Sequence, residues 1–293
     1  MDIEEIKTFI ELSKSRNFSR TADLLHVVQS TVSNRIRSLE EYVGKTLVVR
    51  DKTGIRLTAA GNLFLQYAIQ IVKLDRAALE EIQMASDFTD SLNIASVQWL
   101  FDYYLKEPLI QYSFQNPQIA TNLTIAHSDD ILPLLQNRIY DVALISYRVN
   151  HPSLLCLSLP STPVVFVGQR EQYGYLAKGI RKEELAGIPL IYSDIWENYL
   201  SDISENIVSE SRIFEVRCNM LGSAKAFCLS GSGCCFLPRK MVEKELQTGK
   251  LIQIPIQDLS EKVMQPFMIC RRNRLDSPAL KSWLFLLSEM KKI

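Results

Sequence analysis

The chain has 293 residues, and its 33 Lys and Arg are matched by 33 Asp and Glu, so its formal net charge is zero. This balance excludes indiscriminate polyanion binding by the whole chain, and only local clusters of charge can select a charged partner. The length predicts about two domains. The sequence has no amino-terminal apolar signal segment and no apolar run near the roughly 20 residues that a membrane span requires, so we expect a cytoplasmic protein with no membrane partner.

The first forty-odd residues predict three helices. Apolar residues recur at helical spacing between Asp2 and Ser15, and Ser19 is placed to cap a second, shorter helix. A third helix follows a tight connection at residues 27–28. Its apolar stripe, at spacings of three and four, consists of Val32, Ile36, Leu39 and Val43.

The opposite face of the third helix is polar and carries a net positive charge. Short hydroxyl and amide side chains there can meet base edges in the major groove of DNA, and Arg can meet phosphates. The alternative is a solvated surface helix without a ligand. The order helix, helix, turn, helix favours a helix-turn-helix unit instead. The residues of this polar strip are Ser30, Ser33, Asn34 and Arg37.

A small β-hairpin is predicted after the third helix. Residues 47–50 and 55–57 read as its two strands, and Gly54 supplies the turn between them. The hairpin is a candidate wing, because basic side chains on it can reach phosphates beside the groove.

The same residues carry a family resemblance. Over the first sixty-odd residues the chain resembles the winged helix-turn-helix of LysR-type transcriptional regulators. Val28 departs from the family pattern, which often has a small hydroxyl residue there, so we expect Ser30 to cap the third helix. The resemblance rests on residues 17–22, 25–27, 29–30, 32–33, 36–40, 44, 47, 50 and 57–61.

The partner implied by this domain is double-stranded promoter DNA. Base-edge contacts are expected from Gln29, Ser30, Ser33 and Asn34. Phosphate contacts are expected from Arg35, Arg37, Arg50, Lys52 and Arg56, and Thr31 and Thr53 complete the expected interface.

Beyond Thr58, which can cap it, a long helix is predicted to run to about Asp87. A helix of this length either lies on a second domain or pairs with a copy of itself. In LysR-type regulators the matching segment is the dimerisation helix. The resemblance therefore implies a homodimer or homotetramer on a roughly palindromic site, with RNA polymerase as a further partner if the protein is an activator.

The pattern of apolar and polar residues changes after a polar hinge at residues 89–91. Short apolar runs alternate with helical stretches, which predicts an α/β domain. The expected strands are residues 92–95, 121–126, 142–146, 164–168, 190–193, 214–218, 234–237 and 266–271, and the expected helices include 103–114, 129–137 and 278–291.

This second part resembles the effector module of LysR-type regulators. The resemblance implies two lobes, as in periplasmic binding proteins, with the chain crossing near Thr162 and returning near Phe267. The whole chain is then an α/β multidomain protein. The expected parts are a winged helix-turn-helix at 1–58, a linker helix at 59–88 and an effector domain at 89–293, whose first lobe is 92–162 with 267–293 and whose second lobe is 163–266. The supporting segments are residues 141–145, 185–191, 224–227, 231–238 and 277–280.

The resemblance also places a small-molecule effector in the cleft between the lobes. Free N–H groups at helix starts favour anions, so a carboxylate-bearing metabolite is expected. Trp99 stands where many relatives have a small hydroxyl residue, and it either stacks on an aromatic ligand or fills the cleft. The expected effector-binding residues are Val97, Gln98, Trp99, His127, Ser128, Ser146, Ile195, Trp196 and Ser223.

Catalytic chemistry finds little support in the sequence. His26, His127 and His151 lack metal-ligand spacing, and the glycines at 231–233 are too few for a phosphate loop. We therefore expect no enzyme activity, no cofactor and no metal. An enzyme or solute-binding protein fused to a DNA-binding domain is the alternative, and turnover of a bound ligand would distinguish it.

Cysteines offer a second alternative. Some LysR-type regulators sense oxidants through a cysteine pair in the second lobe, where this chain has several cysteines. Against that reading, cytosolic cysteines are usually small buried hydrophobes, and adjacent cysteines pair only with strain. The second-lobe cysteines are Cys218, Cys228, Cys234 and Cys235, with Cys156 and Cys270 elsewhere.

Overall fold

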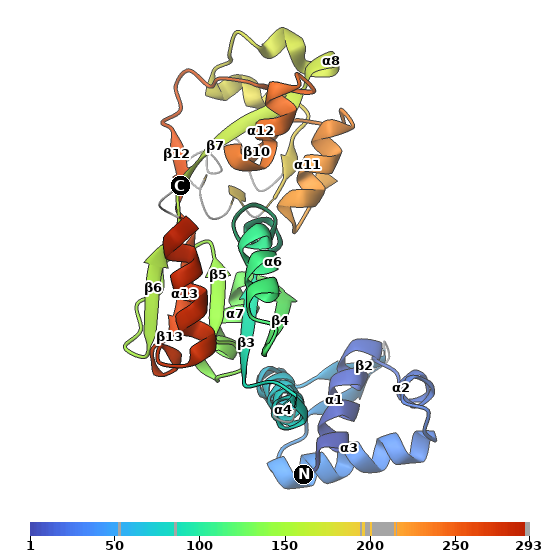
Figure 1. Ribbon diagram of the computed structural model, residues 1–293. Helices are drawn as coiled ribbons and strands as arrows, with labels where there is room; N and C mark the ends of the chain where they lie inside the picture. Colours follow the sequence, from blue (N-terminus) through green and yellow to red (C-terminus); the bar gives the residue numbers. More distant parts are fainter. Residues whose placement is uncertain are drawn as a thin grey trace. The chain divides into compact units, whose positions relative to one another are not determined.

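The computed structural model describes residues 1–51, 54–84, 87–193, 195–196, 200, 214 and 216–290. The chain forms two compact units, Met1–Phe88 and Thr89–Ile293 (Figure 1). No helix among the described residues combines the length and the apolar character needed to cross a membrane.

The amino-terminal unit is a winged helix-turn-helix followed by a long helix, as the sequence predicts. Three helices precede an antiparallel hairpin, whose backbone pairs Val48 with Leu57 and Asp51 with Gly54. The elements are α1 (Ile3–Ser15), α2 (Phe18–Leu24), α3 (Gln29–Val43), β1 (Val48–Asp51), β2 (Gly54–Leu57) and α4 (Ala59–Met84).

Two of the three capping predictions are wrong. The N-cap of α2 is Asn17, whose side chain accepts the N–H of Arg20, while Ser19 lies inside the helix. Helix α3 starts at Gln29 after Val28, which makes no side-chain cap, and Ser30 is already the second helical residue. The prediction for Thr58 is confirmed, since its hydroxyl accepts the N–H of Gly61 at 2.9 Å.

The wing is fastened to the helices by short-range polar and steric contacts. The Glu40 carboxylate accepts the N–H groups of Leu47 and Val48 at 2.7 and 3.1 Å. Gly61, in the first turn of α4, lies against the carbonyl oxygen of Leu47, where a Cβ atom would collide with the backbone. Only glycine fits this close approach.

One apolar core holds the unit together. The stripe predicted on α3 packs against α1, the wing and α4, and Phe64 of α4 lies 5.5 Å, ring centroid to centroid, from Phe9. The buried members are Ile6, Phe9, Leu12, Ala22, Val32, Ile36, Leu39, Leu47, Ile55 and Ala68.

The carboxy-terminal unit has two lobes, and the first is a five-stranded sheet. The strand order is β4–β3–β5–β13–β6, in which β3 pairs parallel with β4 and β5, and β13 pairs antiparallel with β5 and β6. Its strands are β3 (Asp90–Ser96), β4 (Ile119–Ile125), β5 (Val142–Ile145), β6 (Leu154–Ser158) and β13 (Phe267–Arg271).

Helices cover both faces of this sheet (Figure 1). Helices α6 and α13 pack on one face, where the Tyr112 and Trp283 rings meet edge to face at 5.4 Å. Helix α7 packs on the other face through Ile131 and Leu135. The helical elements are α5 (Gln98–Leu100), the π-helical turn η1 (Phe101–Leu105), α6 (Lys106–Gln115), α7 (Ser128–Gln136), the 3-10 turn η4 (Arg272–Arg274) and α13 (Pro278–Met290).

The second lobe is built around β7, which pairs antiparallel with β10, β11 and β12. A parallel pair, β8 with β9, lies beside β10 through a bridge between Leu190 and Cys234. The elements are β7 (Thr162–Gln169), α8 (Arg170–Tyr173), η2 (Gly174–Leu176), η3 (Lys182–Gly187), β8 (Ile191–Tyr192), β9 (Val216–Arg217), α11 (Leu221–Leu229), β10 (Cys235–Pro238), α12 (Arg239–Gln247), β11 (Leu251–Gln253) and β12 (Lys262–Met264).

Two chain segments cross between the lobes. The first runs from the end of β6 to Thr162, and the second runs from Met264 to Phe267. Gln265 in the second segment donates its side-chain N–H to the Leu159 carbonyl of the first, so the two crossings are hydrogen-bonded to each other. They form the hinge from which both lobes extend.

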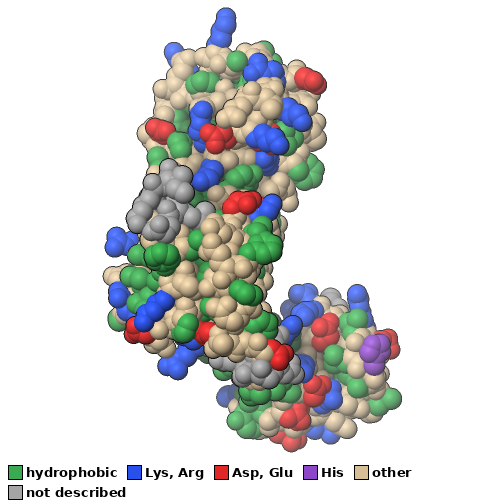
Figure 2. All heavy atoms as spheres, viewed as in Figure 1, with side chains coloured by type: hydrophobic (Ala, Val, Ile, Leu, Met, Phe, Trp, Pro, Cys, Tyr) green, Lys and Arg blue, Asp and Glu red, His purple; other side chains and the backbone are tan. Residues whose placement is uncertain are grey.

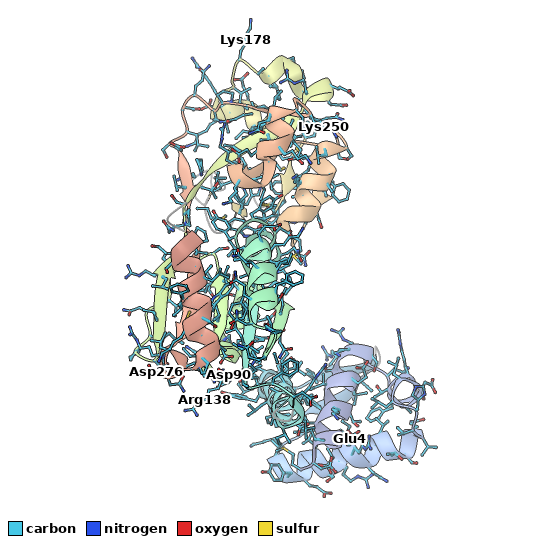
Figure 3. All side chains as sticks on the ribbon, viewed as in Figure 1. Glu4, Asp90, Arg138, Lys178, Lys250 and Asp276 are labelled. Atoms are coloured by element: carbon cyan, nitrogen blue, oxygen red, sulfur yellow. The ribbon has the colours of Figure 1, made fainter. Side chains whose placement is uncertain are left out.

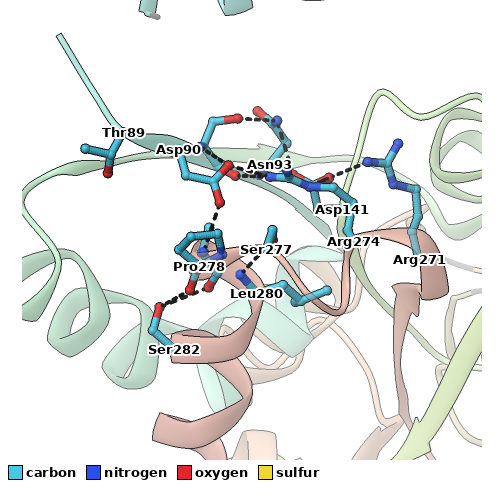
Figure 4. Close-up of polar contacts among 12 residues, drawn as sticks. Thr89, Asp90, Asn93, Asp141, Arg271, Arg274, Ser277, Pro278, Leu280 and Ser282 are labelled. Carbon is cyan, nitrogen blue, oxygen red and sulfur yellow. Dashed lines mark hydrogen bonds and ion pairs between the residues drawn. The ribbon is translucent and has the colours of Figure 1, made fainter.

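A buried ionic cluster closes the end of the first lobe opposite the second lobe, where Figure 3 labels Asp90, and Figure 4 shows its contacts. The Asp141 carboxylate accepts Arg271 Nη2 at 2.8 Å and Arg274 Nε at 3.1 Å. Asp90 accepts Arg274 Nη2 at 2.9 Å and the N–H of Ala279 at 3.0 Å, which fixes the start of α13. Asp276, at the same end of the lobe (Figure 3), is exposed and pairs only with Lys281 at 3.1 Å among the described residues.

Candidate DNA-binding surface and ligand cavity

Helix α3 has the two faces that its sequence predicts. Val32, Ile36 and Leu39 are buried, while Gln29, Ser30, Asn34 and Arg37 are exposed. Thr31 and Ser33 are half-buried at the edges of the polar face. The polar strip is therefore free of the core of its own unit and can meet an external partner.

Arg35 is held differently from the other basic residues of α3. Its guanidinium donates to Thr8 Oγ1 at 3.1 Å and lies 3.7 Å from the Glu4 carboxylate, so it ties α3 to α1. Gln29 also has a neighbour, because its side-chain oxygen accepts the Ser19 hydroxyl at 3.2 Å. This bond holds one of the expected base-reading side chains against α2.

The wing supplies one described basic side chain. Arg56 is exposed on β2. The side chain of Arg50 and the whole of Lys52 and Thr53 lie outside the described residues. Arg20, exposed on α2, is a basic residue that the sequence reasoning left out of the interface.

A cavity of about 560 Å³ lies between the two lobes of the carboxy-terminal unit. This volume is typical of sites for small metabolites. Seven of the nine expected effector residues line it: Val97, Gln98, Trp99, His127, Ser128, Ser146 and Ile195.

Three helices begin at this cavity. Val97, His127 and Met220 are the N-cap residues of α5, α7 and α11, none makes a side-chain cap, and all three line the cavity. The first N–H groups of a helix have no partner within the helix, and its positive dipole end favours anions. The cavity therefore combines helix starts from both lobes.

The remaining two expected residues do not line the cavity. Trp196 is buried in the second-lobe core against Phe214 and Phe236, and its indole N–H donates to the Ile191 carbonyl. Ser223 lies on the exposed side of the first turn of α11. Helical periodicity turns it away while its neighbours Leu221 and Gly222 face the cavity.

Trp99 is only 6% exposed. Its ring packs edge to face against Tyr104 at 5.8 Å and joins the apolar core, so only part of it reaches the cavity. This packing favours the filling role of Trp99 over the stacking role.

Several lining residues escaped the sequence reasoning. Asn219 and Met220 stand at the junction between β9 and α11, which the predicted strand could have revealed. Gln265 and Phe267 belong to the returning hinge segment. Tyr147 and Asp129 form a polar pair at the cavity, with the Tyr147 hydroxyl 3.4 Å from Asp129 Oδ1.

Four of the six cysteines are buried, and Cys156 and Cys218 are half-buried. Burial raises the pKa of the Cys234 and Cys235 thiols well above the usual range and raises the pKa of Cys270 to about 12. Cys228 is also buried, and Cys218 is half-buried with a raised pKa. Because the thiolate is the reactive form, the raised pKa values disfavour oxidation of Cys218, Cys234, Cys235 and Cys270.

Family models match both parts of the chain. The model of the family described as "Bacterial regulatory helix-turn-helix protein, lysR family" matches residues 3–62, and that of the "LysR substrate binding domain" matches residues 85–291. The chain belongs to the LysR family of transcriptional regulators, with a DNA-binding helix-turn-helix and an effector-binding domain.

Individual relatives are distant. CitR of Bacillus subtilis (strain 168), an HTH-type transcriptional regulator, is 26% identical over 261 residues, which cover 88% of this chain and 90% of CitR. HdfR of Yersinia pestis (strain Pestoides F) is 34% identical over 159 residues, about half of each chain.

Solved structures share the fold over nearly the whole length. CbnR, a LysR family transcriptional regulator, has a TM-score of 0.69 at 20% identity and 99% coverage of both chains. Vibrio fischeri DarR, solved in complex with DNA, has a TM-score of 0.58 at 22% identity and 98% coverage of both chains. The predicted multidomain α/β fold is thereby confirmed.

Proposed function

We propose that this regulator is controlled by a small anionic metabolite that binds in the cavity between the lobes. The observation that carries the proposal is the meeting of three uncapped helix starts, from both lobes, at one cavity. Ser128, Ser146 and Gln98 add hydrogen-bonding groups there. A carboxylate group suits these donors, and Asp129 in the first turn of α7 is the acidic residue of the described lining.

Closure of the lobes supplies a mechanism for control. A ligand held by α5 and α7 of the first lobe and α11 of the second favours one arrangement of the lobes over another. The effector can shift the population only by its difference in affinity for these arrangements.

On the DNA side, we propose that Ser30 and Asn34 read base edges and that Arg37 and Arg56 hold phosphates. These side chains are exposed on α3 and the wing. Thr31 and Ser33 flank them on the half-buried edge of α3. The amide of Asn34 can pair with adenine in two hydrogen bonds, which makes it the strongest candidate for base discrimination.

Helix α4 supports the proposal of a homodimer. Leu63, Tyr67 and Leu74, at intervals of four and seven residues, form one apolar stripe that is exposed in the single chain. Such a stripe suits pairing with the same helix of a second copy.

A second exposed apolar face offers a contact for a homotetramer. Ile110 and Phe114 lie one turn apart on α6, and Phe114 is 81% exposed. Figure 2 shows apolar side chains over the segment that carries α6. If the regulator activates transcription, RNA polymerase is a further partner of the DNA-bound oligomer.

A footprinting experiment tests the proposal. Genome-wide mapping of bound DNA in the native host identifies the best site, and purified protein is then footprinted on it with fractions of the metabolite pool. We expect a two-fold symmetric footprint that shortens or shifts with one anionic fraction. A footprint changed only by peroxide would instead support the cysteine alternative.

A further inference from the structure

A second cavity, of about 540 Å³, lies at the hinge on the first-lobe side. Its walls come from the π-helical turn η1, from α6, from the end of β6 and from α13. The lining is mainly apolar and includes Tyr104, Pro108, Leu157, Leu159, Leu284 and Leu287. A concave apolar site of this volume is typical of ligand pockets.

This hinge cavity is separate from the cavity between the lobes. The described lining residues of the two do not overlap. The wall between them contains the edge-to-face pair of Trp99, which lines the inter-lobe cavity, and Tyr104, which lines the hinge cavity. The two rings are in direct contact, so an occupant of one cavity touches a ring that packs on the wall of the other.

One charged side chain at the edge of the hinge cavity comes from the second lobe. Lys240, in the first turn of α12, places its ammonium 4.1 Å from the centre of the Tyr104 ring. Tyr104 is itself fixed, since its hydroxyl donates to the Pro160 carbonyl at 2.8 Å. Among the described residues Lys240 forms no ion pair, and its half-buried side chain places the ammonium over an aromatic face.

The other charges at the rim are weaker candidates for a ligand contact. Lys106, Asp102 and Glu107 also line the cavity, but all three are exposed on the first lobe. Asp102 already accepts the side-chain N–H of Gln98 at 3.1 Å. Lys240 is the cation that is both partly desolvated and placed over the apolar lining.

We propose that the hinge cavity is a second ligand site, for a small amphipathic molecule whose apolar body lies against α13 and whose carboxylate meets Lys240. The occupant contacts α6 and α13 of the first lobe and α12 of the second. It therefore favours lobe arrangements that keep Lys240 beside Tyr104.

Calorimetric titration of the full chain with 2-naphthoate tests the proposal, with 2-naphthylmethanol as the uncharged match. Leu284→Trp fills the hinge cavity, and Phe285→Trp adds the same ring on the exposed side of α13, where Phe285 is 68% exposed. Ser146→Trp fills the inter-lobe cavity instead. We expect 2-naphthoate to bind the wild type, Phe285→Trp and Ser146→Trp alike, and to bind Leu284→Trp at least about tenfold more weakly.

The head-group assignment has its own test in Lys240→Gln. This variant should weaken the binding of 2-naphthoate about tenfold and change the affinity for 2-naphthylmethanol by no more than about twofold, because only the acid carries a charge that Lys240 can meet. In the wild type, 2-naphthoate should also slow acetylation of Lys240, read by mass spectrometry, which needs no cavity variant to fold.

Three results would overturn the proposal. The first is that 2-naphthoate does not bind the wild type. The second is that Ser146→Trp abolishes its binding while Leu284→Trp leaves it unchanged. The third is that Lys240 is acetylated at the same rate with and without the bound probe. If Lys240→Gln lowers the affinities for 2-naphthoate and for 2-naphthylmethanol by the same factor, Lys240 is not the anion contact.

Discussion

The guanidinium of Arg35 donates through Nη1 to Oγ1 of Thr8 at 3.1 Å, which joins helix α3 to α1. Thr8 is fully buried and the side chain of Arg35 is only 25% exposed. We predict that Arg35→Ala lowers the free energy of unfolding by about 1 kcal/mol, because a half-buried charge-assisted bond is lost. Arg37→Ala should leave stability unchanged and lower the slope of log affinity against log salt by about one unit.

Urea unfolding and DNA binding over a salt series measure both effects. If Arg35→Ala lowers the slope of log affinity against log salt as much as Arg37→Ala does, then Arg35 leaves Thr8 in the complex and contacts a phosphate.

Asn34 is predicted to discriminate between bases. At one base position, Asn34→Ala should reduce the difference in binding free energy between the best site and its single-base variants by about 1–3 kcal/mol. The reason is that a bidentate contact to the base is lost. Competition binding with a set of single-base variants measures this change. Arg37→Ala is the matched control, and it should weaken all the sequences to a similar extent.

The exposed stripe of α4 predicts an oligomer that depends on it. Leu74→Glu should convert the dimer to a monomer, because it places a charge in the proposed helix pair. Leu79→Glu, on another face of the same helix, is the control and should keep the dimer. Sedimentation measures the mass, and a dimer that persists in Leu74→Glu would move the interface elsewhere.

The buried cluster at the end of the first lobe should dominate the stability of that lobe. Asp141→Asn leaves Arg271 without its carboxylate in the interior and should lower the free energy of unfolding by about 3–5 kcal/mol. Asp276→Asn, which breaks an exposed pair with Lys281, should produce no measurable change. Equal melting temperatures for Asp141→Asn and the wild type would contradict this assignment.

Asp90 in the same cluster predicts a dependence on pH. Burial alone raises the pKa of this carboxyl, but hydrogen bonds from the Ala279 N–H and from Arg274 outweigh burial and lower the pKa below its ordinary value. A lowered pKa in the folded state means that the stabilisation is complete above the unfolded pKa of about 3.9 and is lost as the pH falls through the folded pKa. Wild type and Asp90→Asn should therefore differ in unfolding free energy at pH 7 and converge below about pH 4, whereas a constant difference would exclude the carboxylate as the cause.

The sequence predicts elements well where their signal is local. The stripe of Val32, Ile36 and Leu39 identifies α3, and the Thr58 hydroxyl marks the start of α4, because periodicity and capping depend on neighbours in the chain. Strands β6, β11 and β12 were missed. They are short and gain their stability from partners more than 80 residues away for β12 and β11 and more than 100 away for β6.

The candidate sites show the same division. Residues after the first-lobe strands could be predicted because strand ends converge at one edge of a parallel sheet. Gln265 and Phe267 could not, since their place at the cavity depends on the hinge crossing. The orientation of Arg35 toward Thr8 likewise depends on how α1 packs on α3, which no spacing in the chain reveals.

The most direct test of the central claim is DNA footprinting of the wild type and of Ser146→Trp on the best genomic site, with and without the anionic metabolite fraction. We predict that both proteins protect the same two-fold symmetric site, because Ser146 lies in the carboxy-terminal unit and the DNA-binding helices lie in the other. Only the wild-type footprint should change with the fraction. An identical response in Ser146→Trp would contradict the assignment of the inter-lobe cavity as the effector site.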